Sequence, residues 1–183
     1  MGENIALIDM DGTVCKYHEA LERDLQAFFG RDRSKVSEMT VAKAGFLIRS
    51  QPGWYRELEP IPFGLKIVDH LKKMGFSIMV LTKGNRWARN AWTEKVEWCK
   101  QHLPGAKVTI TEDKGLVYGK VLVDDWPEYA VRWLEHRPRG IVVMPAKKWN
   151  ADFSTTKLPI FKVRGEADFK RVAPLLKARA EEK

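Results

Sequence analysis

Polar residues follow four short apolar runs in this chain, and their types can act together on a phosphate ester. The runs and the residues that follow them are Ile5–Ile8 before Asp9 and Asp11, Phe76–Leu81 before Thr82 and Lys83, Val108–Ile110 before Lys114, and Val121–Val123 before Asp124 and Asp125. In an open parallel sheet, ligands bind beyond the carboxyl ends of the strands, where such loops converge. We therefore expect these side chains to meet at one edge of a sheet.

The chemistry that this set suits is phosphoryl transfer. A carboxylate can attack phosphorus and form an aspartyl-phosphate that water later hydrolyses. Because nucleophile and substrate are both anionic, a cation must lie between them, and carboxylates from two strands with a backbone carbonyl suit Mg²⁺. A lysine and a hydroxyl can orient the phosphate oxygens. A second carboxylate, two residues from the first, can exchange protons with the leaving oxygen and with water.

Each motif also has a purely structural interpretation. Asp9-Met10-Asp11-Gly12 is a good turn, and Asp124-Asp125 could cap the helix that follows Pro127. We favour the chemical interpretation because the motifs occur together and in this order, each after an apolar run.

The elements that position these residues alternate between strands and helices. A further apolar run lies at Ile141–Val143, and helical patterns cover Phe63–Met74, Arg86–His102 and Pro127–His136. Strands that are apolar along their length, alternating with helices, predict a parallel sheet covered on both faces. We expect an α/β fold with a Rossmann-like, three-layer core.

One stretch interrupts the alternation of strands and helices. Residues 14–59 hold two helical patterns, Glu19–Phe29 and Ser34–Arg49, without a convincing strand. This is far longer than the usual connection of about 2–6 residues in an α/β unit. We therefore predict a small helical cap over 14–59, inserted after the first strand. The core would comprise 1–13 and 60–165, and a terminal helix over 166–183 would dock on it.

Composition limits the class of protein. The chain has 183 residues, of which 44% are hydrophobic and 31% charged, and its net charge is +8. Such a chain can bury a core, and its basic surface favours anionic partners, phosphorylated compounds or nucleic acid. The sequence has no apolar run long enough to span a membrane, no secretory signal and only two cysteines, which predicts an intracellular, cytoplasmic protein.

The ordered motifs resemble a known family. Asp9-Met10-Asp11-Gly12-Thr13, Leu81-Thr82, Lys114 and Asp124-Asp125 resemble the four motifs of the haloacid dehalogenase-like phosphatase superfamily. The 5′(3′)-deoxyribonucleotidases are the most similar branch. They share stretches that resemble Pro52–Pro62, Glu94-Lys95-Val96-Glu97-Trp98 and Thr111–Lys114, and the resemblance covers most of residues 4–126.

The resemblance implies roles for individual residues. Asp9 would be the nucleophile and Asp11 the acid/base, while Asp9, the backbone carbonyl of Asp11, and Asp124 would hold Mg²⁺. The remaining implied assignments are Thr82, Lys83 and Lys114 as phosphate ligands, Asp125 as a support of the metal site, and Trp54 and Tyr55 as a cap slot for the base. Lys120 competes with Lys114 for the lysine role, but it lies at the start of the fourth predicted strand.

Two departures affect the expected substrate. Lys83-Gly84-Asn85 replaces a Ser-Pro that follows the motif threonine in the animal enzymes, and Trp126 stands where some members have arginine. The resemblance implies a Mg²⁺-dependent phosphomonoesterase acting on nucleoside monophosphates, with deoxyribonucleotides expected first. The sugar, the phosphate position and the base stay open.

Two alternative functions remain at this stage. One is a 3′-phosphatase that acts on nucleic-acid ends, which makes nucleic acid the second choice of partner. The other is a non-catalytic module that binds phosphate or nucleic acid, which would have no need of a nucleophile paired with an acid/base. A homodimer is left open.

Overall fold

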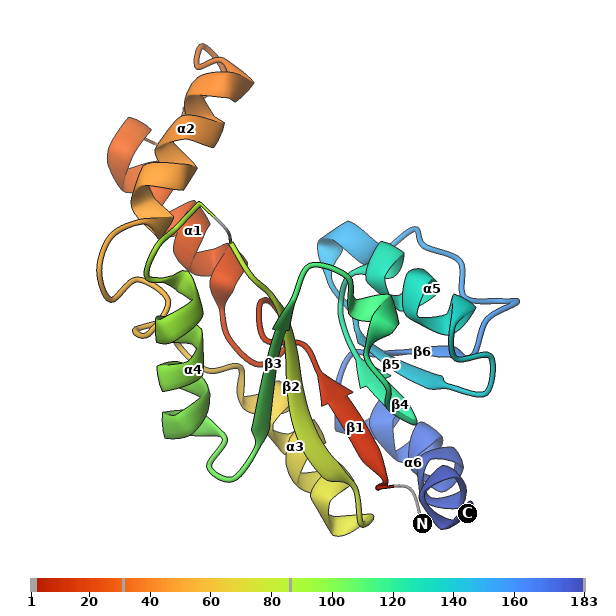
Figure 1. The fold of residues 1–183 in the computed structure, drawn as a ribbon. Coiled ribbons are helices and arrows are strands. Elements are labelled where there is room, and N and C mark those ends of the chain that lie inside the picture. Colours follow the sequence, from red (N-terminus) through yellow and green to blue (C-terminus); the bar gives the residue numbers. More distant parts are fainter. Residues whose placement is uncertain (1–2, 31, 86, 183) are drawn as a thin grey trace.

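The computed structural model describes residues 3–30, 32–85 and 87–182, and a parallel six-stranded sheet forms its centre (Figure 1). The strands are β1 (Ile5–Ile8), β2 (Ser77–Lys83), β3 (Lys107–Thr111), β4 (Val121–Val123), β5 (Ile141–Pro145) and β6 (Ile160–Val163). Their spatial order is β3-β2-β1-β4-β5-β6. The predicted α/β fold with a Rossmann-like parallel core is confirmed, and β1 lies at its centre.

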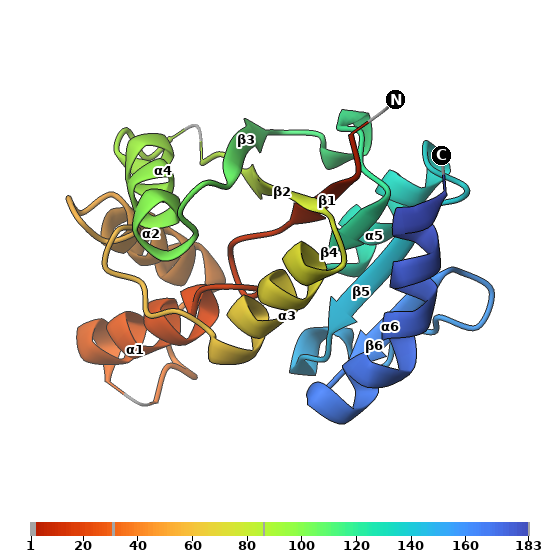
Figure 2. The same cartoon turned by 90° about the horizontal axis from the view of Figure 1, so that it is seen from below.

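Helices cover both faces of this sheet (Figure 2). They are α3 (Pro62–Lys73), α4 (Ala91–His102), α5 (Pro127–Glu135) and α6 (Glu166–Glu181), together with the short 3₁₀ turns η1 (Lys114–Leu116) and η2 (Lys148–Asn150). Successive side chains of a strand point to opposite faces. Accordingly, Ala6 and Ile8 pack in one cluster with α3 and α6, whereas Leu7 packs in the other with Trp133 of α5. Both faces of the sheet are therefore buried.

Two helices begin later than predicted. The helix predicted from Arg86 begins at Ala91, because a turn in which Asn85 Oδ1 accepts from the Trp87 amide precedes it. Arg86 lies outside the described residues, as do residues 1–2 of the predicted core and 183 of the terminal helix. The helix predicted from Ser34 begins at Glu38, because Ser37 caps it by accepting from the Thr40 amide.

The strand β6 was not predicted. It has only four residues and carries Lys162 among its apolar side chains, so its pattern is too short and too polar to stand out. It lies at the edge of the sheet, where a charged residue is tolerated. The Lys162 ammonium donates to the Asn150 carbonyl at 2.5 Å and thereby ties this edge to η2.

The segment between β1 and α3 forms the helices α1 (Tyr17–Phe29) and α2 (Glu38–Arg49). They stand beyond the carboxyl ends of the strands, on the side of β2 and β3 (Figure 1). The beginning and the end of the segment meet at its base. There the Lys16 amide donates to the Glu59 carbonyl at 2.8 Å, and the Ile61 amide donates to the Val14 carbonyl at 2.7 Å. We call residues 14–59 the insertion.

The helix α6 packs on the sheet at the opposite end from the insertion. Its stripe of Phe169, Val172 and Leu176 is buried. The Asn4 side chain donates to the Ala180 carbonyl at 2.7 Å, so the segment before β1 and the end of α6 lie together. Among the described residues, no helix is long and apolar enough to cross a lipid bilayer.

Candidate active site

The loop after β1 brings two acidic side chains to the edge of the sheet. The Asp9 amide donates to the Val123 carbonyl at 2.8 Å, which extends the pairing of β1 with β4 by one residue. Gly12 then turns the chain with φ +81°, a conformation that side chains disfavour. A Cβ at Gly12 would lie 2.6 Å from Asp125 Oδ2. Glycine is therefore needed both for the turn and for the approach of Asp125.

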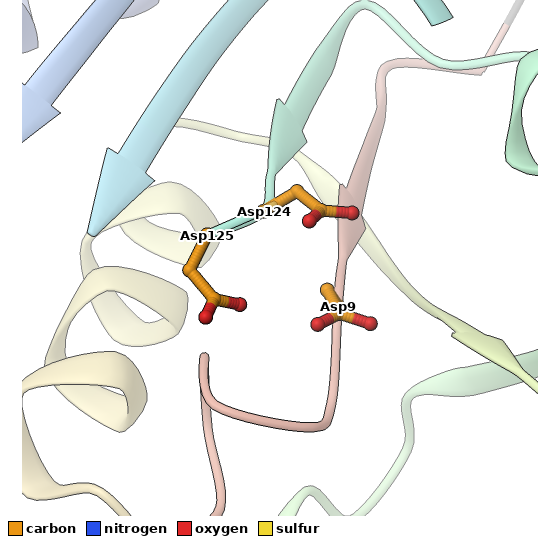
Figure 3. A group of neighbouring side chains, drawn as sticks. All are labelled: Asp9, Asp124 and Asp125. Atoms are coloured by element: carbon orange, nitrogen blue, oxygen red, sulfur yellow. The ribbon is translucent and has the colours of Figure 1, made fainter. Parts of the chain in front are cut away.

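Three buried carboxylates converge at this edge (Figure 3). One oxygen from each of Asp9, Asp124 and Asp125 can be chosen so that all three lie within 4.8 Å of one another. The first follows β1 and the other two follow β4, neighbouring strands whose ends coincide. Carboxylate oxygens are the ligands that a hard divalent cation prefers. The arrangement therefore fits the predicted metal site, and Asp125 lies beside Asp9 and Asp124.

Lys114 lies among these acids on η1, which Asp113 caps by accepting from the Gly115 amide. Its ammonium donates to Asp9 Oδ1 at 2.6 Å and to Asp124 Oδ2 at 2.7 Å, and its side chain is 2% exposed. Lys120, by contrast, lies at the far end of β4 and donates to carbonyls at the end of α6. The structure thus brings Lys114 to the cluster and leaves Lys120 outside it.

Burial changes the acidity of this cluster. Removal from water raises the pKa of Asp9 to about 7 against the opposing effect of the Lys114 ammonium, and the charges of Asp124 and Asp11 add to the rise. Burial likewise raises the pKa of Asp124. Burial alone would lower the pKa of Lys114, but the carboxylates of Asp124 and Asp9 outweigh it and raise that pKa. A divalent cation bound at the cluster, in addition to the Lys114 ammonium, would reduce the repulsion among the carboxylates.

Asp125 is held by three residues for which no site role was predicted. Its carboxylate accepts from Thr13 Oγ1 at 2.9 Å and from the Trp149 indole N–H at 3.0 Å. Its backbone carbonyl accepts from the side-chain amide of Asn150 at 2.9 Å. Trp149 and Asn150 belong to η2 after β5, a position that the rule of strand ends could have drawn attention to.

A second buried ammonium, that of Lys95 on α4, lies beside Asp11 and Thr82. It donates to Asp11 Oδ2 at 2.5 Å, to Thr82 Oγ1 at 2.9 Å and to the Lys83 carbonyl at 2.9 Å. The sequence analysis gave Lys95 no role, although a signal was present. Ala91, Lys95 and the residues around Trp98 form the buried stripe of this helix, and a lysine in such a stripe needs partners.

A cavity of about 710 Å³ opens above these groups. Its lining residues, from the loops and from the insertion, are Asp9, Asp11, Tyr17, His18, Arg49, Tyr55, Lys83, Gly84, Asn85, Trp87, Lys95, Glu112, Lys114, Asp125, Trp126 and Tyr129. Lys83 lies at the end of β2 with its side chain exposed, and its ammonium is 5.4 Å from the centre of the Tyr129 ring. Thr82 is fully buried and does not line the cavity, and its hydroxyl accepts from the Lys95 ammonium at 2.9 Å.

The two aromatic residues expected to receive a base are placed differently. Tyr55 lines the main cavity, and its hydroxyl accepts from the Asn85 amide at 3.4 Å. Trp54 instead lines a separate cavity of about 360 Å³, and its indole N–H donates to Asp24 at 2.8 Å. The structure therefore does not bring Trp54 to the predicted base slot, because the turn before α3 points successive side chains to different sides.

Solved structures share this fold. A protein of Burkholderia xenovorans LB400, provisionally assigned as a haloacid dehalogenase-like hydrolase, has a TM-score of 0.64, 13% identity, and coverage of 96% of this chain and 99% of its own. A phosphoserine phosphatase in its apo form has a TM-score of 0.59, 15% identity, and coverage of 94% and 98%. These similarities show that the parallel α/β fold is shared with haloacid dehalogenase-like proteins.

Sequence comparison narrows this class to one family. A family model described as 5′ nucleotidase, deoxy (pyrimidine), cytosolic type C, matches residues 3–155. The human cytosolic-type 5′(3′)-deoxyribonucleotidase is 27% identical in an alignment of 154 positions, which covers 72% of this chain and 74% of the human protein. The chain belongs to this family of phosphoric monoester hydrolases, which confirms that it is an enzyme.

Proposed function

We propose that this enzyme hydrolyses nucleoside monophosphates, with deoxyribonucleotides preferred, through a phosphoryl group carried by Asp9. The observation that carries the proposal is the placement of the Asp9 carboxylate, which lines the cavity while Lys114 and the acids after β4 surround it. A nucleophile that shares a cavity with a lysine and a site for a cation can meet an anionic phosphate.

We assign the metal to the carboxylates of Asp9, Asp124 and Asp125, which the geometry of the cluster fits. When bound, Mg²⁺ would neutralise charge between the nucleophile and the phosphate. Asp11 contributes its backbone carbonyl in the arrangement that the family resemblance implies. Lys114 and Thr82, with Lys83 at the rim, are assigned to the phosphate oxygens.

The reaction balances in two steps. An oxygen of Asp9 forms a bond to phosphorus while the ester P–O bond breaks, and Asp11 gives its proton to the leaving oxygen of the nucleoside. A water molecule then attacks phosphorus, Asp11 takes a proton from that water, and the bond from Asp9 to phosphorus breaks. Inorganic phosphate leaves with both carboxylates restored.

Residues 14–59 act in this proposal as a cap that encloses the nucleoside. Tyr17 and Arg49 of the insertion line the cavity from the side opposite the strand ends, and Tyr55 adds an aromatic wall. A cavity partly closed by an insertion suits a single nucleotide better than the end of a polymer, so the nucleic-acid 3′-phosphatase stays the second choice. An intracellular location accords with such a substrate.

The test is phosphate release from a panel of deoxyribonucleoside and ribonucleoside 5′- and 3′-monophosphates, measured with Mg²⁺ and with a chelator. We expect release that requires Mg²⁺ and is faster for deoxyribonucleotides. Release only from 3′-phosphorylated oligonucleotides would replace the proposal with the polymer-end activity. Failure to release phosphate from any of these compounds would contradict both.

A further inference from the structure

The ammonium of Lys95 is saturated by protein acceptors. An ammonium group has three N–H donors. Those of Lys95 are directed to Asp11 Oδ2, Thr82 Oγ1 and the Lys83 carbonyl, and its side chain is 1% exposed. A lysine that binds phosphate would need a donor free for the substrate. The geometry of Lys95 therefore favours holding protein groups in place over binding substrate.

The partners of Lys95 come from two different strands. Asp11 follows β1, whereas Thr82 and Lys83 belong to β2. Lys95 therefore fixes the carboxylate of one loop relative to the hydroxyl of the neighbouring strand. A displacement of about 1 Å at a reacting group can cost on the order of 100-fold in rate.

The contact also distinguishes the two oxygens of Asp11. An ammonium has no lone pair and can only donate. Oδ2 of Asp11 must therefore accept from Lys95, so a proton on this carboxyl group resides on Oδ1. Asp11 Oδ1 has a weaker contact, with the Cys15 thiol, which donates to it over a sulfur–oxygen distance of 3.9 Å. Oδ1 is thus the oxygen from which a proton can be given.

The position of Lys95 is itself fixed by α4 and the insertion. The preceding residue, Glu94, is buried and accepts from the backbone amides of Gly53 at 2.6 Å and Tyr55 at 3.1 Å. The ammonium of Lys95 lies 5.3 Å from the centre of the Tyr55 ring. The helix that carries Lys95 is therefore attached to the same turn that forms a wall of the cavity.

We propose that Lys95 is a positioning residue for the proton transfer by Asp11. It holds Oδ2 as an acceptor, keeps the acid proton on Oδ1 and aligns Asp11 with Thr82. The proton then passes from Oδ1 to the leaving oxygen while the ester P–O bond breaks, and Oδ1 later accepts a proton from the attacking water. This inference rests on the proposed function, because it needs Asp11 to act as the acid/base.

The test compares Lys95→Met with Lys100→Met on two substrates. Lys100 lies on the exposed side of the same helix and serves as the matched control. One substrate is the best nucleotide of the panel. The other is p-nitrophenyl phosphate, whose phenolate is a good leaving group that gains little from a proton. Both kcat and KM are measured, and the melting temperature reports on folding.

We expect Lys95→Met to lower kcat on the nucleotide by about 100-fold, with KM changed less than about threefold. The loss in the first-turnover release of p-nitrophenolate, which precedes hydrolysis of the phosphoryl-enzyme, should be about tenfold or less, and Lys100→Met should match the wild type. In an Asp11→Asn background, Lys95→Met should cause little further loss on the nucleotide, because both changes act on the same step. Lys95→Gln, which keeps an N–H donor, is measured in parallel in case Lys95→Met does not fold.

Two results would overturn the inference while leaving the proposed function intact. Equal losses in the first-turnover release of the two leaving groups would show that Lys95 only supports the fold. A large rise in KM with kcat unchanged would show that Lys95 binds the phosphate. A wild-type enzyme that released phosphate from neither nucleotide nor aryl phosphate would instead refute the proposed function, and the inference with it.

Discussion

The wall of the cavity at the strand ends and the wall formed by the insertion differ in how their side chains are held. At the strand ends, Asp9, Lys114 and Asp124 are almost fully buried and bind one another directly. On the insertion, Arg49 is half-buried and donates to neutral partners, the Tyr17 hydroxyl and the Gly45 carbonyl. The register of the parallel strands positions the side chains of the first wall. Contacts between segments that are distant in sequence position those of the second.

This difference separates the expected roles of the two walls. Charges that are buried and paired with one another are already held in place. They can therefore stabilise groups whose charge changes during the reaction without rearranging. Half-buried donors on the insertion can instead contact the part of a substrate that does not react. Substitutions at the strand ends should therefore lower kcat, and substitutions on the insertion should raise KM.

The largest effect is expected for Asp9→Asn. The amide cannot attack phosphorus, so kcat should fall by on the order of 10⁴-fold or more, while the protein stays folded. Activity assays paired with circular dichroism check this. Substantial remaining activity in a folded variant would remove Asp9 from the mechanism.

The next effect in size is expected for Lys114→Met. It removes the ammonium that pairs with Asp9 and Asp124 and leaves two buried carboxylates close together. Breaking a buried pair in this way costs about 3–5 kcal/mol of unfolding free energy. Urea denaturation in the presence of a chelator measures the loss, and added Mg²⁺ should restore part of it.

The control for Lys114→Met is Lys100→Met, which removes an exposed lysine and should change the free energy of unfolding by less than about 0.5 kcal/mol. If Lys114→Met were as stable as this control, the acids at the strand ends would not depend on Lys114. The contrast between the two walls would then lose its electrostatic basis.

Arg49→Leu tests the insertion wall. Loss of a charged donor should raise KM for nucleotides by about tenfold, equal to about 1.4 kcal/mol, with kcat changed less than about twofold. Steady-state kinetics on the preferred nucleotide give both constants. A fall in kcat comparable to that of Asp9→Asn would mean that the insertion takes part in the chemical step.

The smallest effect is expected for Trp54→Phe. Its indole N–H donates to Asp24, and the ring lines the separate, smaller cavity. The change should cost about 1 kcal/mol of unfolding free energy and leave KM for nucleotides unchanged. A several-fold rise in KM would return Trp54 to the base slot that the sequence predicts for it.

Two rules explain what the sequence could predict about the fold and the site. The strands β1 to β5 and the residues after them were predicted because buried strands are continuous apolar runs and their ends share one edge, which placed Asp9, Thr82 and Asp124 correctly relative to one another. Lys114 was also placed, because it follows β3 by only a few residues. These inferences need only local pattern and the geometry of a parallel sheet.

The rest depends on packing between distant segments. Lys95 reaches Asp11 across 84 positions of sequence, and Trp149 reaches Asp125 from beyond the next strand. The opposite orientations of Trp54 and Tyr55 depend on a turn held by the carboxylate of Glu94. Periodicity and strand ends can point to positions such as Lys95 and Trp149 but do not reveal their partners, so these contacts became visible only in the structure.

The most direct test of the account is to trap the phosphoryl group on the enzyme. The wild type is mixed with a nucleotide in Mg²⁺, quenched in acid within the first turnover and digested for peptide mass spectrometry, with Asp9→Asn as the control. We predict one phosphoryl group on the peptide that holds Asp9 and none in the variant. A phosphoryl group on another residue, or none during active turnover, would contradict the central role of Asp9.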